Sequence, residues 1–474
     1  MEKTIKDQNG LSHPPVVCVL GHVDHGKTTL LDKIRKTSVA EKESGGITQS
    51  IGASIVVTKE GKKITFIDTP GHAAFANMRS QGARVADIAI LVVAGDDGVK
   101  PQTKEALNCI LTSEIPFIVA VTKIDLPSSQ VDSVKAQLEK EGVVFEGKGG
   151  DVPLIAVSAK TGEGMEELLE MIVLVSELAN VKGEEKGQLE SVVIETGKDK
   201  RGIFATVIIR NGKLEVGEEI VTGDARTKIR GIFDHQGKPV KKLLPGEPGQ
   251  IIGFSHPPAV GSKVWHSQEK KDILEVSKPK LIQVIKKKNE GEISVVIKAK
   301  SAGSLEAILS NLPKGIFLVD FSVGDVNESD IFMAKPAGAY IFAFESKTSG
   351  SVKKLAEAEG VGIYSFKIIY ELFEKLEKVV EESKVQILGK AKVIESFPYD
   401  DKRIAGCKLD EGKIAKTDKL ILTRNEKKLG EVKIISIKKG RQVVEKVKQG
   451  EEFGVLFTPQ LEFKVGDVLI SERN

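Results

Sequence analysis

The sequence contains little cysteine, and its cysteines are isolated. Cys18, Cys109 and Cys407 are the three present in 474 residues, and no two of them have the short spacing of a zinc motif. This content excludes a disulfide-rich scaffold and is typical of proteins from a reducing compartment. The cysteines therefore predict a cytoplasmic protein.

Long hydrophobic runs are also missing. A helix that spans a bilayer needs about 20 consecutive apolar residues, whereas the longest runs, such as "IAILVVA" at 88–94, are much shorter. The opening "MEKTIKDQNGLSHPP" lacks the apolar segment of a signal peptide. We therefore expect no membrane partner and a cytoplasmic location.

Neither sign of charge is in large excess. Seventy Lys and Arg residues oppose 67 Asp and Glu residues, for a net charge of +3, so any nucleic-acid contact must come from local basic clusters. Forty per cent hydrophobic and 29% charged residues are typical of a folded, soluble protein. At roughly 150 residues per domain, the length predicts about three domains, with two or four equally admissible.

The spacing of apolar runs predicts an α/β multidomain protein. From 16 to about 180, short β-branched runs alternate with helix-length segments, which indicates a mostly parallel sheet covered by helices. Close-spaced strand patterns follow, then a second α/β alternation, a helical stretch and a final β segment. The expected parts are a disordered N-terminus at 1–13, an α/β domain at 14–181, a β-barrel at 188–268, a small α/β/α domain at 276–366, a linking helix at 367–385 and a C-terminal β-barrel at 386–474.

Local signals add detail to this division. Asn211 and Gly212 stand between two extended runs and predict a type I′ hairpin turn. Asn327 and Asp330 are spaced like a capping box at the start of a helix. The apolar face expected on the linking helix consists of Ile369, Leu372, Phe373, Leu376 and Val380.

The two β segments show a loose internal repeat. Residues 212–222 and 246–254 recur as 412–423 and 450–457, in the same order and with a similar separation. Hairpins share turn chemistry and can look alike by chance, but the matching order favours a duplicated barrel.

The strongest motif is "GHVDHGKTT" at 21–29. Gly21, Gly26, Lys27 and Thr28 match the GxxxxGK[ST] pattern between a predicted strand and a predicted helix. The glycines let backbone N–H groups turn toward phosphates, Lys27 reaches the β and γ oxygens, and the Thr28 hydroxyl is a ligand for Mg²⁺. The sequence therefore predicts a nucleotide site here.

Three further motifs follow strands in the expected order. "DTPGH" at 68–72 places Asp68 near the magnesium ion, with water between, and Gly71 near a γ-phosphate. "TKID" at 122–125 supplies the carboxylate of Asp125, which accepts both donors of a guanine edge that adenine lacks, and "SAK" at 158–160 supplies backbone for the guanine O6. The residues expected to hold the nucleotide are Gly21, His22, Val23, Asp24, His25, Gly26, Lys27, Thr28, Thr29, Asp68, Gly71, Thr122, Lys123, Asp125, Ser158, Ala159 and Lys160. Together the four motifs predict a P-loop GTPase domain.

On these motifs the chain resembles bacterial translation initiation factor two over essentially its whole length. Translational GTPases share "GHVDHGKT" and "DTPGH", while "AAFANMRSQGA" and the order barrel, α/β, helix, barrel point to this family among them. We interpret the chain as a short form that lacks the long N-terminal extension common in that family.

The resemblance implies roles for individual residues of the site. His72 matches the residue that positions the attacking water, and Val23 and Ile47 match the apolar pair between which it must swing. Thr48 matches the switch threonine that ligates Mg²⁺ only in the GTP state. Asp24 lies beside the phosphates it would repel, so the family's use of a monovalent cation, K⁺ or Na⁺, is expected there.

The sequence departs from the family pattern at two positions of this site. Thr122 stands where the family usually has asparagine, and Ser50 stands where it has histidine. We expect an asparagine at 122 to tighten GTP binding, because its longer amide reaches N7 and ties neighbouring loops together. For His22 and His25 the sequence indicates no chemistry of their own, and loop histidines held by backbone contacts are the preferred interpretation.

The C-terminal barrel resembles the part of the family that holds the end of the initiator tRNA. Lys438, Lys439 and Arg441 form a short basic stretch that would attract phosphates without reading sequence. Cys407 matches one wall of the family's pocket for formylated methionine, while Phe453 replaces a second cysteine. An aromatic ring in that place predicts a narrower pocket or a side chain that faces away.

The resemblance implies a monomeric initiation factor that binds GTP or GDP with Mg²⁺ and K⁺ or Na⁺. In the GTP state it would hold initiator tRNA on the small ribosomal subunit and promote joining of the large subunit, with other initiation factors as partners, and then hydrolyse GTP on the ribosome. Two alternatives stay open, namely an elongation-type GTPase that delivers tRNA, and a GTP-gated factor for ribosome or RNA assembly without useful hydrolysis.

Overall fold

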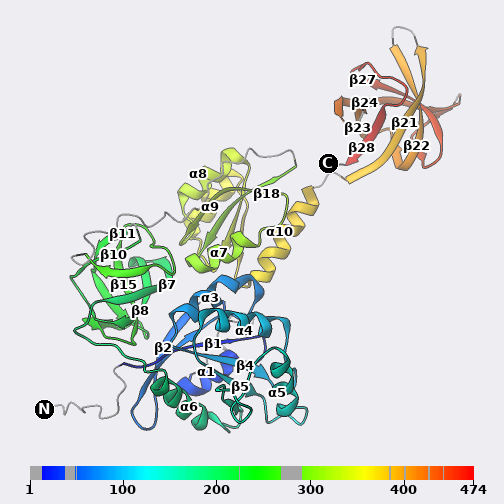
Figure 1. Cartoon of the computed structure of the whole chain (residues 1–474). Coiled ribbons are helices and arrows are strands. Elements are labelled where there is room, and N and C mark those ends of the chain that lie inside the picture. The colour runs from blue at the N-terminus through cyan, green and yellow to red at the C-terminus, as the bar shows by residue number, and fades with distance from the viewer. Residues whose placement is uncertain are drawn as a thin grey trace. The chain divides into compact units, whose positions relative to one another are not determined.

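The computed structural model describes residues 13–37, 48–49, 51–223, 225–267, 291–383, 386–399, 402–424, 427–440 and 442–473. The chain divides into two compact units, Met1–Glu377 and Lys378–Asn474. The first unit contains an α/β domain, a barrel and a second α/β domain, and the second unit contains another barrel (Figure 1). Within the described residues, no helix is both long and apolar enough to cross a membrane.

The first α/β domain is built on a six-stranded sheet in the order β2-β3-β1-β4-β5-β6. Its strands are β1 (Val16–Gly21), β2 (Gly52–Val57), β3 (Lys63–Asp68), β4 (Ile88–Ala94), β5 (Phe117–Thr122) and β6 (Leu154–Ala156), and its helices are α1 (Lys27–Arg35), α3 (Ala76–Val85), α4 (Pro101–Ser113), α5 (Val131–Lys140) and α6 (Met165–Leu178). Every residue of β1 and β4 is buried, as expected for strands covered on both faces. All strand pairs except β2–β3 are parallel, so the loops after β1, β3, β5 and β6 emerge at one edge of the sheet.

The first barrel has strands in the order β11-β10-β16-β7-β8-β15-β12-β13, and a separate pair β14-β9. The strands are β7 (Glu190–Asp199), β8 (Gly202–Asn211), β9 (Leu214–Glu215), β10 (Glu219–Thr222), β11 (Ala225–Lys228), β12 (Gly231–Asp234), β13 (Pro239–Val240), β14 (Lys242–Leu243), β15 (Pro248–Phe254) and β16 (Lys263–His266). The hairpin predicted at Asn211–Gly212 is wrong, because β8 pairs with β7 and β15 and not with the strand that follows it. The Asn211 amide instead bonds the preceding segment, accepting from the Glu184 N–H and donating to the Gln188 carbonyl.

The second α/β domain has a four-stranded parallel sheet in the order β18-β17-β19-β20. Its strands are β17 (Ile293–Ala299), β18 (Ile316–Val323), β19 (Tyr340–Phe344) and β20 (Ile363–Phe366), and its helices are α7 (Ala302–Ser310), α8 (Glu328–Ala337) and α9 (Gly350–Glu359). The predicted capping box is confirmed, since Asn327 and Asp330 cap α8 reciprocally. Helix α10 (Ile369–Ser383) follows, and on its predicted apolar face Ile369, Leu372, Leu376 and Val380 are buried while Phe373 is half-buried.

The second barrel is a closed sheet of six main strands. It runs β21-β28-β23-β24-β27-β22, and pairing of β22 with β21 closes the ring. Its strands are β21 (Gln386–Tyr399), β22 (Lys402–Ala415), β23 (Lys419–Arg424), β24 (Lys427–Lys439), β25 (Gln442–Val444), β26 (Lys446–Lys448), β27 (Glu452–Thr458) and β28 (Val468–Arg473). The pairings β7–β8, β8–β15 and β16–β7 of the first barrel reappear here as β21–β22, β22–β27 and β21–β28.

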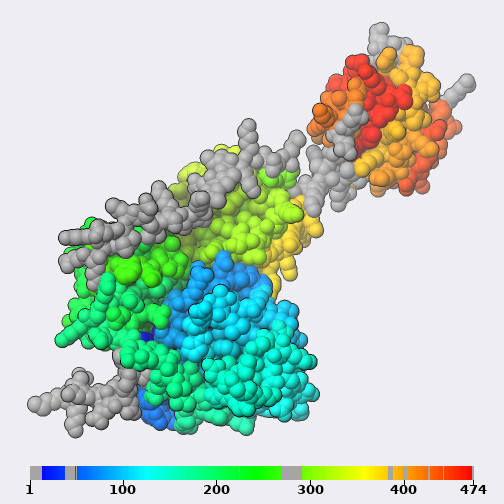
Figure 2. Space-filling model, in the orientation of Figure 1, coloured from blue at the N-terminus to red at the C-terminus, as the bar shows by residue number. Residues whose placement is uncertain are grey.

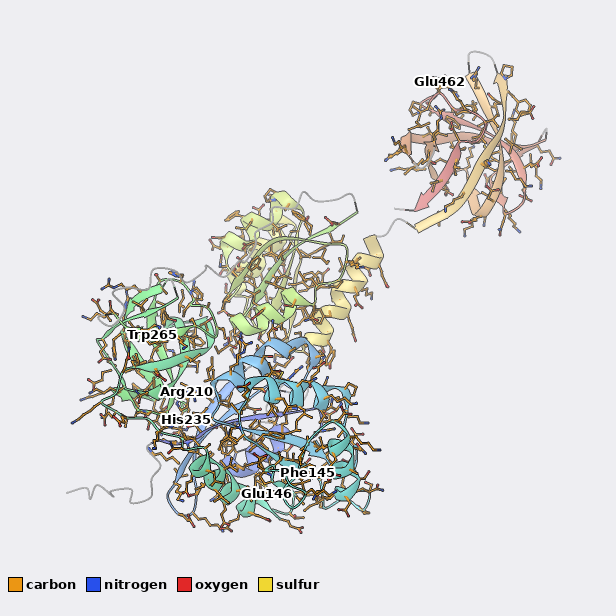
Figure 3. All side chains as sticks on the ribbon, in the orientation of Figure 1. Phe145, Glu146, Arg210, His235, Trp265 and Glu462 are labelled. Carbon is orange, nitrogen blue, oxygen red and sulfur yellow. The ribbon has the colours of Figure 1, made fainter. Side chains whose placement is uncertain are left out.

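The three domains of the first unit are joined by polar contacts. The Arg210 guanidinium of the first barrel, labelled in Figure 3, pairs with the buried carboxylate of Asp87 at 2.7 Å. The Gly303 N–H at the start of α7 donates to the Glu195 carboxylate of β7 at 3.2 Å. In the space-filling view the atoms of these domains form a continuous surface (Figure 2). The first contact joins the barrel to the first α/β domain, and the second joins the barrel to the second α/β domain.

Candidate nucleotide site

The loop between β1 and α1 has the backbone that a phosphate cradle requires. Gly21 has φ of 153°, and a Cβ atom there would lie 2.4 Å from the Val92 carbonyl oxygen, so only glycine fits. Gly26, at φ of 83°, makes the left-handed turn into α1. Asp24 also has positive φ, at 61°, and its carboxylate is exposed beside the cavity described next. These glycine conformations allow backbone N–H groups of the loop to approach a ligand.

A cavity of about 230 Å³ lies at this loop. Its lining residues are Val23, Asp24, Gly26, Lys27, Thr28, Thr29, Thr48, Gly71, His72, Lys123 and Tyr370. We call it the nucleotide cavity. Ten of these eleven residues come from the motifs named in the sequence, and the structure brings them together from four separate segments of the first α/β domain.

Lys27 is buried at the base of the nucleotide cavity. Its ammonium group donates to the His22 carbonyl at 2.5 Å, and burial lowers the pKa of Lys27 to about 8, against the opposing pull of Asp68. Among the described residues this buried cation has a hydrogen bond to one carbonyl and the more distant carboxylates of Asp68 and Asp24, so its charge is poorly compensated. An incoming phosphate would supply the missing negative charge, which is the chemistry expected of this lysine.

The oxygen atoms near Lys27 fit a magnesium ion. The hydroxyls of Thr28 and Thr48 lie 2.8 Å apart. Asp68 is 3% exposed, and its Oδ1 has no hydrogen-bond partner in the part of the chain that the structure describes. Its Oδ2 lies 3.9 Å from the Arg35 guanidinium. Hydroxyl and carboxylate oxygens are the donors that Mg²⁺ prefers, so this set suits the ion.

Burial also explains the titration of Asp68. Desolvation raises the pKa of its carboxyl to about 6, although Arg35 and Lys27 both oppose that shift. A nearby cation stabilises the charged form of a buried carboxylate, especially when one of its oxygens accepts no hydrogen bond. The group is therefore poised to gain a divalent ion together with a nucleotide.

His72 lines the nucleotide cavity, directly after Gly71. Its Nδ1 accepts from the Ala74 N–H at 2.9 Å, so the ring caps the short 3₁₀ helix η2 (Ala73–Phe75). Burial and the nearby Arg79 lower the pKa of His72, so the ring is neutral at pH 7. A Cβ added to Gly71 would meet the Lys27 Nζ at 2.4 Å, which shows how closely this turn approaches the phosphate-binding lysine.

Arg79 of α3 holds the backbone of this turn and was given no role by the sequence reasoning. Its guanidinium is 1% exposed and donates to the carbonyls of Pro70, Gly71 and His72, while a second nitrogen pairs with Glu105 at 2.7 Å. Three consecutive carbonyls on one planar cation fix the path of the loop. The only signal was its place in "AAFANMRSQGA", where no chemistry could be assigned to an arginine without the fold.

Two contacts tie the nucleotide cavity to the start of α10. The Tyr370 ring packs edge-on against His72, with ring centroids 4.2 Å apart. The Gln49 side chain, next to Thr48, donates to the Lys367 carbonyl at 2.7 Å and accepts from the Ile369 N–H at 3.0 Å. Tyr370 and Gln49 were also missed, because a contact across more than 290 residues leaves no local pattern in the sequence.

The base-recognition residues are close to one another on the loops after β5 and β6. The Ser158 hydroxyl donates to Asp125 Oδ1 at 2.7 Å, which fixes the carboxylate expected to accept from guanine. The Thr122 hydroxyl donates to the His25 carbonyl at 2.7 Å. Thr122 therefore already links the loop after β5 to the phosphate loop. From the sequence, we had expected an asparagine to be needed for this link.

The remaining predicted residues have simpler settings. Lys123 has positive φ, at 59°, and its ammonium lies 3.6 Å from Asp96, while Ala159 is half-buried and Lys160 is exposed. Ile47 and Ser50 lie outside the described residues.

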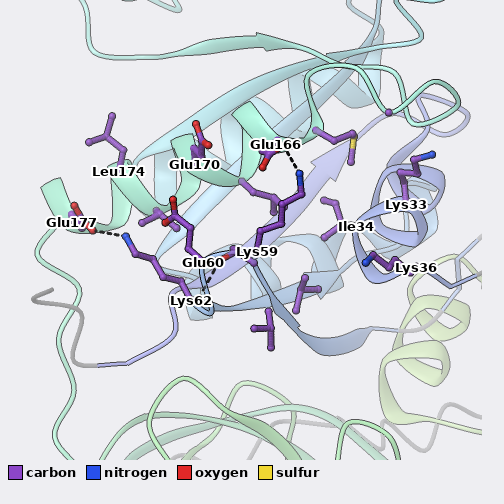
Figure 4. Close-up of a pocket in the computed structure, with 17 residues that line it drawn as sticks. Lys33, Ile34, Lys36, Lys59, Glu60, Lys62, Glu166, Glu170, Leu174 and Glu177 are labelled. Atoms are coloured by element: carbon purple, nitrogen blue, oxygen red, sulfur yellow. Dashed lines mark hydrogen bonds and ion pairs between the residues drawn. The ribbon is translucent and has the colours of Figure 1, made fainter. Parts of the chain in front are cut away.

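A larger cavity of the same domain lies away from these motifs. It has about 520 Å³ between α6 and the β2–β3 hairpin (Figure 4). Ion pairs of Lys59 with Glu166 and of Lys62 with Glu177 span it at 2.6 and 3.3 Å. Exposed pairs of this kind contribute little stability. None of the described motif residues lines this cavity, so its larger volume does not make it the candidate nucleotide site.

The second barrel contains its own cavity, which we call the barrel pocket. It has about 350 Å³ and is lined by Ile394, Glu395, Phe397, Ile404, Gly406, Cys407, Ser436, Lys438, Gly440, Glu452, Phe453, Gly454 and Leu456. Cys407 and Phe453 are direct cross-strand partners of β22 and β27, so both side chains lie on the same face.

The predicted tRNA residues have different environments in this barrel. Phe453 is 4% exposed and belongs to the barrel core while lining the pocket, so it does not face away. Burial raises the pKa of the Cys407 thiol to about 12 and keeps it protonated. Lys438 lines the pocket, whereas Lys439 is paired with Glu451 at 2.8 Å. Arg441 lies outside the described residues.

Comparisons with protein families match most of the chain. Residues 13–177 match the elongation factor Tu GTP-binding domain, residues 188–267 match elongation factor G domain 2, and residues 267–377 match translation-initiation factor 2. The three matches follow the order of the domains in the first unit.

Curated relatives match over almost the whole chain. The translation initiation factor IF-2 of Kosmotoga olearia is 40% identical and aligns with 99% of this chain and 72% of its own length. The IF-2 of Thermus thermophilus is 37% identical over 99% of this chain and 90% of its own length. The IF-2 of Nitratiruptor is 39% identical over 98% of this chain, which spans 59% of that longer relative.

Proposed function

Because the chain belongs to the translation initiation factor IF-2 family of translational GTPases, we propose that it binds GTP in the nucleotide cavity and hydrolyses it on the ribosome. The observation that carries this proposal is the convergence of Lys27, Thr28, Thr48 and His72 on one cavity beside a buried Asp68. Phosphoryl transfer needs little more than positioning and charge compensation. These residues are suited to supply both.

The binding roles follow from the geometry of each group. Lys27 would neutralise the β and γ oxygens, and Thr28, Thr48 and Asp68, the last through water, would hold Mg²⁺. The magnesium ion would supply charge compensation between the phosphates. The exposed Asp24 carboxylate beside the same cavity is suited to a monovalent cation, K⁺ or Na⁺, which would offset its repulsion of the phosphates.

His72 would orient the attacking water. Its ring is neutral at pH 7, and the residue lines the nucleotide cavity, with its backbone fixed by Arg79. In the conformation seen here Nδ1 is engaged by the Ala74 N–H and the ring rests on Tyr370. Hydrolysis would require the imidazole to leave these contacts and turn inward, between Val23 and Ile47. Contact with the ribosome is the event expected to favour that turn.

The second barrel would hold the aminoacylated end of initiator tRNA. Its pocket combines apolar walls, Cys407 and Phe453 among them, with Lys438 at the lining. A small apolar pocket suits a methionine side chain, and a lysine suits nearby phosphates. Through this site the protein would place initiator tRNA on the small subunit and promote joining of the large subunit. It would act as a monomer, with other initiation factors, in the cytoplasm.

Phosphate release with and without ribosomes tests the hydrolytic part of this proposal. The full chain should hydrolyse GTP slowly alone and much faster with both ribosomal subunits. If ribosomes do not stimulate release, the chain is better described as a GTP-gated assembly factor. Comparing initiator with elongator aminoacyl-tRNA by filter binding separates the initiation role from an elongation-type role, which the match of residues 267–377 to translation-initiation factor 2 already disfavours.

A further inference from the structure

Two histidines of the phosphate loop remain without a role after the nucleotide site is assigned. Neither His22 nor His25 is among the residues that line the nucleotide cavity, and their rings lie against each other, with centroids 4.9 Å apart and planes at 75°. The carboxylate of Asp97, in the loop after β4, lies beside them. One ligand atom from each of these three residues falls within 4.8 Å of the other two.

The chemical state of the two rings suits metal ligation. His25 is 1% exposed, so its ring is shielded from water. Nδ1 of both rings is buried and has no hydrogen-bond partner among the described residues. An imidazole binds a metal ion through one nitrogen, and in His25 the nitrogen nearest Asp97 is Nε2, so the unpartnered Nδ1 of that ring would carry the proton.

The separation between His25 and Asp97 fits a metal better than a hydrogen bond. Nε2 of His25 and Oδ2 of Asp97 are 3.4 Å apart, which is beyond the usual range for an N–H···O bond. Two ligands of a tetrahedral zinc ion with bonds of about 2.0–2.1 Å lie about 3.3 Å from each other. The carboxylate is 43% exposed and can rotate, although Lys100 holds its other oxygen at 2.7 Å.

We propose that His22, His25 and Asp97 form a binding site for a transition-metal ion, with Zn²⁺ as the best match. Two imidazoles and one carboxylate are a zinc-type donor set, and a water molecule would complete the tetrahedron. Mg²⁺, which prefers oxygen ligands and octahedral geometry, would not compete well for it.

Metal binding here would stiffen the phosphate loop. His22 and His25 flank Val23 and Asp24, and the His22 and His25 carbonyls accept from Lys27 and Thr122. A metal that joins both side chains to the loop after β4 fixes that backbone and slows nucleotide exchange. This consequence rests on the proposed GTP binding, whereas the metal site itself does not.

The first experiment measures metal binding by the nucleotide-free full chain in excess Mg²⁺. Co²⁺ should bind once per chain with the strong visible absorption of tetrahedral coordination, and Zn²⁺ should displace it. Asp97→Asn and His22→Gln should each weaken binding at least tenfold, whereas His256→Gln, an exposed histidine of the first barrel, should leave it unchanged. Melting temperatures check that the variants fold. Equal binding by wild type and both variants, or a weak octahedral spectrum, would overturn the site.

The second experiment measures release of a fluorescent GDP analogue. Zn²⁺ should slow release from the wild-type chain severalfold and leave Asp97→Asn unaffected. Equal slowing in both proteins would overturn the link between this site and the phosphate loop. Because the first experiment uses no nucleotide, failure of GTP binding would be seen separately from failure of the metal site.

Discussion

The nucleotide cavity and the barrel pocket differ in what they bury. The first is lined by a buried cation, Lys27, and lies beside a buried carboxylate, Asp68, and desolvation shifts the pKa values of both groups. The second buries Cys407 and Phe453 in an apolar core, with Lys438 at its lining. We therefore expect ligands to be selected by charge in the first cavity and by shape in the second. Changes of a single charge should have large effects in the first, and changes of volume should have smaller effects in the second.

The largest effect is expected at His72. His72→Ala should leave GTP affinity nearly unchanged and lower ribosome-stimulated hydrolysis by roughly a hundredfold or more, since a positioning residue acts in the transition state. Phosphate release under single-turnover conditions measures it, with His256→Ala as the control for loss of a histidine. Wild-type turnover in the His72 variant would remove this residue from the mechanism.

The next effect concerns the choice of base. Asp125→Asn should weaken GTP by roughly ten- to a hundredfold, because hydrogen bonds to a charged acceptor are worth about 1.5–3 kcal/mol. It should improve binding of xanthosine triphosphate, since an amide donates to the oxygen that replaces the guanine amino group. Competition between the two nucleotides measures the switch. Asp132→Asn, on the exposed face of α5, is the matched control.

The two cavities were also unequally predictable from sequence. A phosphate loop is local, so Gly21, Gly26, Lys27 and Thr28 identify it through spacing alone. The order of domains likewise follows from apolar periodicity. The contacts of Tyr370 with His72, and of Gln49 with Ile369, join residues far apart in the chain. No local sequence pattern around these residues predicts the contacts.

The barrel pocket is an extreme case of the same limit. Its walls come from β21, β22, β24 and β27, and a single-residue shift of register would turn Cys407 and Phe453 to the other face. Sequence supplied only a resemblance for these two residues. The hairpin wrongly expected at Asn211–Gly212 has the same origin, because the partner of a strand is decided by tertiary pairing.

A fall in pH should weaken ligand binding in the nucleotide cavity. In the proposed site Mg²⁺ would bind the carboxylate form of Asp68, whose pKa is raised to about 6, so affinity for Mg²⁺ and GTP should fall as pH falls through 6. Below that value the loss approaches about tenfold per pH unit, the slope for one competing proton. Titration calorimetry between pH 5 and 7.5 measures it. Asp68→Asn should bind weakly with a flatter profile, and an equally steep profile in that variant would exclude Asp68 as the cause.

Thr122 offers a smaller and more local test. Thr122→Val removes the hydroxyl that bonds the His25 carbonyl, and the lost bond should weaken GTP about fivefold, for roughly 1 kcal/mol. Thr122→Asn should tighten GTP, because the longer amide reaches N7 of the base. Equilibrium binding of both variants is compared with that of wild type. If the asparagine variant binds GTP more weakly, threonine is the adapted residue in this buried setting.

The smallest effect is expected in the barrel pocket, where volume and not charge is changed. Phe453→Cys removes a ring that both lines the pocket and packs in the core. The wider pocket should alter the ratio of affinities for formyl-methionyl and methionyl initiator tRNA by about fivefold or less, at the low end of the about 1–3 kcal/mol that one small group is worth in an apolar pocket. Filter binding with the full chain measures this ratio.

The matched control for this change is Phe463→Cys. Phe463 is equally buried in the same core but does not line the barrel pocket, so its loss should destabilise the barrel without altering the ratio.

Lys438→Ala should weaken the binding of all tRNAs to a similar extent, since the attraction between lysine and phosphate does not depend on nucleotide sequence. An unchanged ratio in Phe453→Cys, together with loss of binding in Lys438→Ala, would make this barrel a phosphate-binding surface. Selection of the initiator would then have to arise from charge here as well, and the contrast with the nucleotide cavity would disappear.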